Sequence, residues 1–237
     1  MKTIILFGLR RSGNHYIIST IMQQFKNIVH INDVELSLEK YKKFKNINID
    51  KNKKRIDNEW VGFKGTDCVI ISLENKNINF NQINKFKNIN DCYLLLLLRS
   101  PYTNFSSIWK VYEKELDRKD RLKEVVDKWS IYAKNFNEKN ILVKILYDEF
   151  SIDKNYRNKI LNRIGINNIK IDNNFNIKYQ ESSYDDKSKS QQVYKSLNTC
   201  IYKCDKEFIN IVKRGSINKL WIDIVKGQNL LHRFKNN

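Results

Sequence analysis

Two arginines inside a glycine-bounded loop are the first residues of this sequence that could do chemistry. The stretch from Gly8 to His15 reads Gly-Leu-Arg-Arg-Ser-Gly-Asn-His. Its two glycines have the G-x4-G spacing of loops whose backbone N–H groups hold phosphate at the start of a helix. Arginine adds a planar, permanently charged group that suits tetrahedral oxyanions. The segment therefore predicts a binding site for phosphate or a related anion.

The residues after the second glycine distinguish this loop from that of magnesium-dependent kinases. The kinase loop continues with lysine and then with serine or threonine, whose hydroxyl binds Mg²⁺. Asn14 and His15 occupy these two positions here. We therefore expect no metal, and the loop favours transfer of a group with fewer charges than phosphoryl, such as sulfuryl.

A second candidate phosphate site follows an apolar run further along the chain. Arg99 comes directly after the run Tyr93–Leu98, and Ser107 follows eight residues later. If the run is a strand, Arg99 lies at its carboxyl end and Ser107 lies one to two turns into the next helix. Ligands of open parallel sheets bind at that edge. The spacing therefore predicts that both side chains reach one phosphate.

Together the two motifs resemble the sulfotransferases that use 3′-phosphoadenosine 5′-phosphosulfate (PAPS). Arg11–Tyr16 is similar to their 5′-phosphosulfate loop, in the arginine version of carbohydrate-modifying members. Arg99, Pro101 and Ser107 match the three positions of their 3′-phosphate motif. The resemblance implies that Arg11 acts on the transferred group and that Tyr16 lies near the adenine. The nucleotide-binding residues that it implies are Arg10, Arg11, Ser12, Gly13, Asn14, His15, Tyr16, Arg99 and Ser107.

Sulfuryl transfer to a hydroxyl also needs a general base. Glu74, after the apolar run Cys68–Leu73, is the first candidate, and Asp33, after Ile28–Ile31, is the second. Asp67 and His30 stay open, since a strand-end carboxylate is often only a surface charge or a helix cap. The expected catalytic residues are therefore Arg11, Glu74, Asp33 and His15.

Three further segments have weaker matches to the same family. Ile145–Phe150 is similar to an element after a late strand, and we expect it to be structural. Lys213–Gly215 faintly matches a C-terminal phosphate clamp, but its surroundings fit an ordinary helix equally well. Glu181–Asp185 stands where a lid would close, and it fits a disordered loop equally well.

Alternating apolar runs and helical patterns predict a three-layer, P-loop-like α/β fold with a mainly parallel sheet of about five strands. The fourth strand does not alternate, so we expect it at the centre of the sheet. Helices are expected over 120–136 and, broken near Gly215, over 191–225. The Lys/Asn-rich segments 42–58, 75–90 and 165–180 are interpreted as connections or short irregular elements, unless the compositional bias conceals secondary structure there. We expect one domain over 1–237, with a core over about 1–165 and a helical or lid region after it. The expected strands are Thr3–Phe7, Ile28–Ile31, Cys68–Leu73, Tyr93–Leu98 and Ile141–Leu146.

Composition leaves two other functions open. The net charge of +18 fits either an evenly spread lysine bias or a field that attracts polyanions. The alternatives to a sulfotransferase are a P-loop kinase and a non-catalytic polyanion binder.

PAPS and its product PAP are the expected partners, and nucleic acid is not. The acceptor is a hydroxyl or an amine, with carbohydrate among the candidates, and the oligomeric state stays open. No targeting segment or membrane span is recognisable, which favours a cytoplasmic protein.

Overall fold

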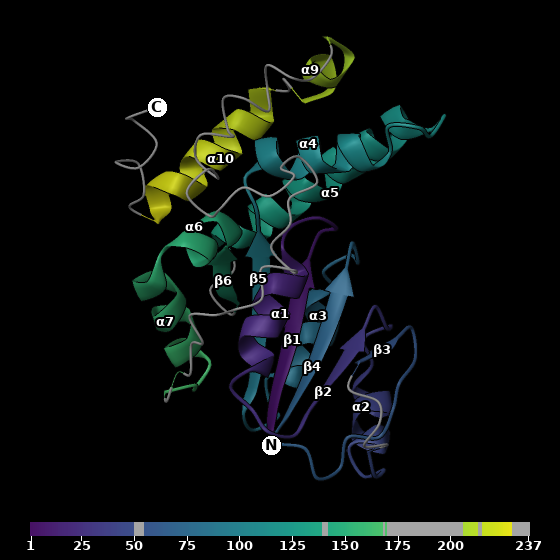
Figure 1. The fold of residues 1–237 in the computed structure, drawn as a ribbon, viewed down its shortest axis with the longest axis vertical. Coiled ribbons are helices and arrows are strands. Elements are labelled where there is room, and N and C mark those ends of the chain that lie inside the picture. The colour runs from purple at the N-terminus through teal and green to yellow at the C-terminus, as the bar shows by residue number, and fades with distance from the viewer. Residues whose placement is uncertain (50–54, 139–141, 168, 170–205, 213–214, 229–237) are drawn as a thin grey trace.

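A computed structural model describes residues 1–49, 55–138, 142–167, 169, 206–212 and 215–228. The strands in these residues form one parallel sheet with the order β3-β2-β4-β1-β5-β6 (Figure 1). They are β1 (Lys2–Gly8), β2 (Ile28–Asn32), β3 (Arg55–Asp57), β4 (Cys68–Glu74), β5 (Cys92–Leu98) and β6 (Val143–Leu146).

Helices cover both faces of this sheet, which confirms the predicted three-layer α/β fold. The core on one face contains residues of α1, α6 and α7, and the core on the other contains residues of α2 to α5. The described helices are α1 (Asn14–Met22), α2 (Leu38–Phe44), α3 (Phe80–Phe86), α4 (Pro101–Val111), α5 (Arg118–Glu138), α6 (Tyr147–Ile152), α7 (Lys154–Arg163), α9 (Lys206–Val212) and α10 (Gly215–Gly227). None of them combines the length and the apolar character that a membrane span requires.

The leucine run of β5 shows why a strand without alternation lies inside the sheet. β5 pairs with β1 on one side and with β6 on the other. Leu96 and Leu98 belong to the core on the α3–α5 face, whereas Leu95 and Leu97 belong to the core on the α1 face. Both faces of the strand are therefore buried, as the sequence predicts.

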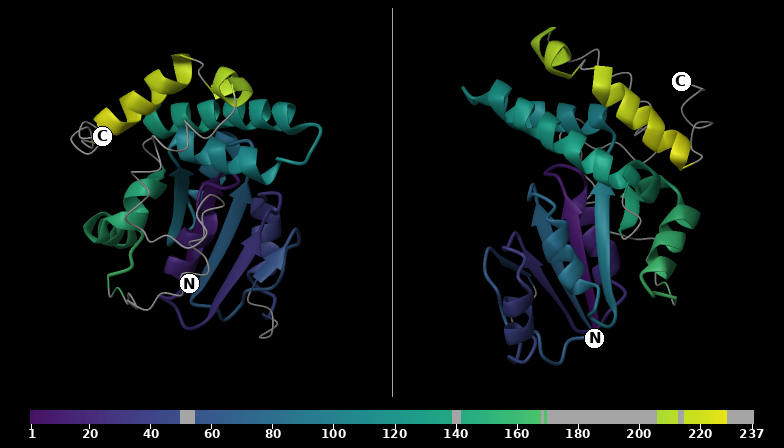
Figure 2. Two further views of the ribbon diagram at one scale, coloured as in Figure 1. Left: turned by 45° about the horizontal axis from the view of Figure 1, so that its top comes forward. Right: turned by 180° about the vertical axis from the view of Figure 1, so that it is seen from behind.

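The two C-terminal helices pack on the outer helical layer. Trp221 of α10 lies against Trp129 of α5, with ring centroids 6.4 Å apart, and Phe208 of α9 lies 5.7 Å from Trp109 of α4. Both helices lie above α4 and α5 in the two views of Figure 2. α9 ends at Val212 and α10 begins at Gly215, the residue near which the sequence predicts a break.

Short elements in the Lys/Asn-rich segments are the main difference from the sequence prediction. β3, all of α3 and part of α2 lie where connections or short irregular elements were expected, and with β3 the sheet of the described residues has six strands. Each helix starts at a side-chain cap: Ser37 Oγ accepts the N–H of Lys40, and Asn79 Oδ1 accepts that of Asn81. One buried aromatic in each helix, Tyr41 or Phe86, then anchors it to the core.

Some predictions fall outside the described residues. These are the candidate lid Glu181–Asp185, residues 50–54 of segment 42–58, most of segment 165–180, the part of the expected helical stretch over 191–205, and Lys213 and Arg214 of the possible clamp.

A buried histidine joins β2 to β4. His30 Nε2 lies 2.7 Å from Ser72 Oγ, and Ser72 in turn donates to Asn32 Oδ1 at 2.6 Å. Burial, assisted by the charge of Arg55, lowers the pKa of His30 to about 4. His30 is therefore neutral near pH 7.

This pKa makes stability depend on pH. In the unfolded chain His30 has its ordinary pKa of about 6.5, so unfolding takes up a proton between pH 6.5 and 4. We predict that its contribution is complete above pH 6.5, and that the free energy of unfolding falls by about 3 kcal/mol as the pH decreases to 4. Urea unfolding at several pH values measures the decrease. His30→Gln keeps an N–H for Ser72 and should lose most of this dependence, so an unchanged dependence would contradict the assignment.

Candidate functional site

The loop between β1 and α1 is a compact turn that requires glycine at Gly13. Arg11 and Gly13 both have left-handed backbone, with φ of 61° and 95°. Ser12 closes the turn, because its N–H and its hydroxyl both donate to the Leu9 carbonyl, at 3.1 and 2.6 Å. A Cβ on Gly13 would lie 2.0 Å from the ring of Tyr147. The second glycine of the G-x4-G motif is therefore fixed by both backbone and packing.

The structure brings Arg11 together with the second predicted phosphate site. Arg11 Nε donates to Ser107 Oγ at 3.0 Å, and Arg99 Nη1 donates to the Arg11 carbonyl at 2.9 Å. The Arg99 guanidinium lies 4.9 Å from the centre of the Tyr147 ring, which positions it further. Two strand-end motifs more than 80 residues apart thus form one basic cluster.

The close approach of these arginines favours an anion between them. Burial lowers the pKa of Arg11, and the nearby charge of Arg99 lowers it further. A bound phosphate or phosphosulfate oxygen would compensate both effects, because each guanidinium could donate hydrogen bonds to it.

Arg10 has different surroundings from Arg11, although the two are adjacent in sequence. The Arg10 N–H donates to Asn75 Oδ1 at 2.9 Å, and its carbonyl accepts from Asn104 Nδ2 at 3.0 Å. The pKa of Arg10 is raised, mainly by a side-chain hydrogen bond with Tyr112. The structure therefore separates the two arginines that sequence reasoning assigned to one anion.

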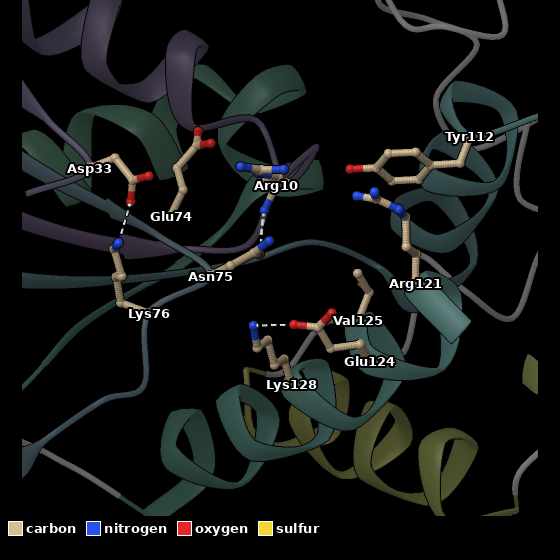
Figure 3. A pocket seen from close by; sticks show the side chains of 10 residues that line it. All are labelled: Arg10, Asp33, Glu74, Asn75, Lys76, Tyr112, Arg121, Glu124, Val125 and Lys128. Atoms are coloured by element: carbon tan, nitrogen blue, oxygen red, sulfur yellow. Dashed lines mark hydrogen bonds and ion pairs between the residues drawn. The ribbon is translucent and has the colours of Figure 1, made fainter. Parts of the chain in front are cut away.

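Arg10 lines an open pocket of about 370 Å³ beside the β1–α1 loop (Figure 3). The pocket brings together the two preferred base candidates, Glu74 and Asp33, from the ends of β4 and β2. Its other wall is one face of α5. The lining residues are Arg10, Asp33, Glu74, Asn75, Lys76, Tyr112, Arg121, Glu124, Val125 and Lys128.

Sequence reasoning missed most of this lining. The four residues contributed by α5 recur at intervals of three and four, which marks one helix face. This spacing is the only feature of the sequence that could have indicated these residues. It does not show that this face of α5 points towards the loop. Asn75 and Lys76 follow the candidate base directly and were passed over as part of a connection.

The two carboxylates have partners of different charge. Asp33 Oδ1 lies 3.2 Å from Lys76 Nζ in an ion pair. Glu74 Oε1 instead accepts a hydrogen bond from the neutral Asn14 amide at 2.9 Å. Asp33 is thus neutralised by a cation, whereas the charge of Glu74 is not cancelled by that bond.

The remaining candidates occupy different places. His15 is exposed on the first turn of α1, whereas Tyr16 is buried and has a pKa raised by burial. Asp67 precedes β4 and accepts the N–H of Asn27 at 2.9 Å, so it lies at the opposite edge of the sheet from the loop. His30 is buried within β2. Neither Asp67 nor His30 lines the pocket.

Asp148, in the segment expected to be structural, supports the second motif. Its carboxylate is buried and accepts the N–H of Ser100 at 2.8 Å, directly before α4. Burial raises the pKa of Asp148, and the positive charge of Arg99 opposes that rise. Asp148 therefore holds the junction from which Arg99 projects.

A scan against protein-family models finds no match to this chain, and a search of curated proteins finds none either. Within the described residues, no group of three or more His, Cys, Asp or Glu side chains could hold a metal ion.

The glycine requirement at position 13 can be measured against a matched site. Gly65 also has positive φ, 83°, but a Cβ there would meet nothing within 4 Å. We predict that Gly65→Ala lowers the free energy of unfolding by about 1–2 kcal/mol, the cost of left-handed backbone. Gly13→Ala should cost about 1–3 kcal/mol more, because the methyl group also overlaps Tyr147. Urea unfolding measures both free energies. Equal costs would show that the Tyr147 ring can move away without a loss of stability.

Proposed function

We propose that this protein is a PAPS-dependent sulfotransferase. The observation that carries the proposal is the hydrogen bond from Arg11 to Ser107, together with the contact of Arg99 with the Arg11 carbonyl. A single phosphate-binding loop would fit any nucleotide. Two basic motifs that contact each other fit a donor with phosphates at both its 5′ and its 3′ positions. The resemblance drawn from the sequence supports the same donor.

The proposed reaction is an in-line displacement at sulfur. Arg11 and the loop would hold the 5′-phosphosulfate, and Arg99 with Ser107 would hold the 3′-phosphate. The acceptor oxygen forms a bond to sulfur, the bond from sulfur to the bridging phosphate oxygen breaks, and PAP leaves. Glu74 would accept the acceptor's proton, and the arginines would stabilise the charge that develops on the leaving oxygen.

The pocket lining supports a polar acceptor. Val125 is its only aliphatic side chain, and seven of its other residues are charged. A pocket of this kind has many hydrogen-bonding groups and little apolar surface for a flat phenol or steroid. We therefore propose a hydroxyl-rich acceptor, such as a carbohydrate, with its hydroxyl directed to Glu74.

The donor assignment predicts discrimination between PAP and ADP. We expect PAP to raise the melting temperature in the absence of Mg²⁺, and ADP, which lacks the 3′-phosphate, to have a much smaller effect. Arg99→Ala should weaken PAP binding about 10- to 100-fold, the loss of a charged hydrogen bond, and should weaken the binding of ADP much less.

Arg163→Ala serves as the matched control, because Arg163 is exposed on α7. This variant should bind PAP like the wild type. Equal stabilisation by PAP and ADP would contradict the donor assignment, and affinity for ATP that requires Mg²⁺ would favour a kinase instead.

The base assignment predicts the effect of Glu74→Gln. With ³⁵S-labelled PAPS and a panel of oligosaccharides, we expect the variant to lose about 10²–10⁴-fold in kcat, the usual contribution of a general base. Its affinity for PAP, measured by calorimetry, should stay within about twofold, because Glu74 lies on the acceptor side. Asp33→Asn should have a smaller effect, since Asp33 is paired with Lys76. A larger loss of kcat in Asp33→Asn than in Glu74→Gln would make Asp33 the base.

A further inference from the structure

Asn14 occupies the position of the phosphate-binding lysine of a kinase loop, but its side chain points into the protein. It is 3% exposed, and its amide nitrogen donates to the Leu9 carbonyl at 3.1 Å and to Glu74 Oε1 at 2.9 Å. The two hydrogens of this amide are thereby both used. Asn14 therefore links the loop that would hold the donor to the carboxylate proposed as the base.

The space for this link depends on Gly8. A Cβ on Gly8 would lie 1.9 Å from Asn14 Oδ1, so only glycine leaves room for the amide in this position. Gly8 also pairs in register with Glu74 across the β1–β4 ladder, and its carbonyl accepts the N–H of Asn75. The first glycine of the motif thus makes the Asn14–Glu74 contact possible.

We propose that Asn14 is a positioning residue that fixes the Glu74 carboxylate in the acceptor pocket. This inference rests on the proposed sulfotransferase function. Because one amide binds both the donor loop and the carboxylate, the distance between the sulfur and the base is set before the acceptor arrives. The neutral amide leaves Glu74 its negative charge and its second oxygen, whereas a lysine at this position would neutralise it.

The contact can be tested without any turnover. The side-chain amide resonances of ¹⁵N-labelled Asn14 should move in Glu74→Gln, because their hydrogen bond to a carboxylate is replaced by one to a neutral amide. In stability measurements, Asn14→Ala and Glu74→Gln should be non-additive in a double-mutant cycle. Additive stability effects together with unmoved Asn14 amide resonances would overturn the contact.

The positioning role is tested with PAPS alone and water as the acceptor. In that reaction water attacks sulfur, its proton goes to Glu74, and sulfate and PAP are released. We expect Asn14→Ala and the isosteric Asn14→Asp to lower kcat at least about 10-fold, with the KM for PAPS within about threefold of wild type. In a Glu74→Gln background the same changes should lower kcat less than about twofold further, because the residue acts through Glu74.

Asn84→Ala, an exposed asparagine of α3, is the matched control and should leave kcat unchanged. Equal losses of kcat in the wild-type and Glu74→Gln backgrounds would overturn the positioning role. So would a loss of PAP affinity as large as the loss of kcat, because Asn14 would then be a nucleotide ligand. If the wild-type protein does not bind PAP, the sulfotransferase proposal itself fails, and the NMR comparison with Glu74→Gln still reports on the contact.

Discussion

Three hydrogen bonds that join the β1–α1 loop to Arg99 and α4 determine the arrangement of the site. Arg99 donates to the Arg11 carbonyl, Asn104 donates to the Arg10 carbonyl, and Arg11 donates to Ser107. Two of these bonds hold the backbone at consecutive residues, so they fix the directions in which the two arginine side chains leave the loop. Arg11 turns towards the second motif and Arg10 towards the pocket.

The sheet order explains how one short loop can lie next to residues that follow two different strands. β1 lies between β4 and β5, and all three strands run parallel. The residues that follow β4, Glu74 and Asn75 among them, therefore flank the loop on one side, and Arg99 after β5 flanks it on the other. Ligands of open α/β sheets bind at this carboxyl edge. The Arg11–Arg99 cluster and the pocket with Glu74 are thus adjacent because the strands that carry them are adjacent.

The sequence was sufficient for features that depend on local spacing. The glycine-bounded turn between β1 and α1, the buried leucine strand, and the positions of Arg99 at a strand end and Ser107 in the next helix follow from strand ends and helical periodicity. The pocket wall on α5 could not be predicted. The spacing of residues in the sequence identifies a helix face, but it does not show in which direction that face points. The Lys/Asn bias also concealed β3, where a single buried residue, Ile56, accompanies two exposed ones. Such short elements are stabilised by tertiary contacts rather than by their own propensity.

The distribution of charge within the site argues against a surface that simply attracts polyanions. In the pocket, Lys76 pairs with Asp33 and Lys128 pairs with Glu124, at 3.2 and 2.6 Å. These cations are balanced locally, so the net charge of +18 does not determine what the pocket accepts. The Arg11–Arg99 cluster is different, because two guanidinium groups lie close enough for one to lower the pKa of the other. Positive charge is therefore concentrated in that cluster, while the lysines of the pocket beside it are paired with carboxylates.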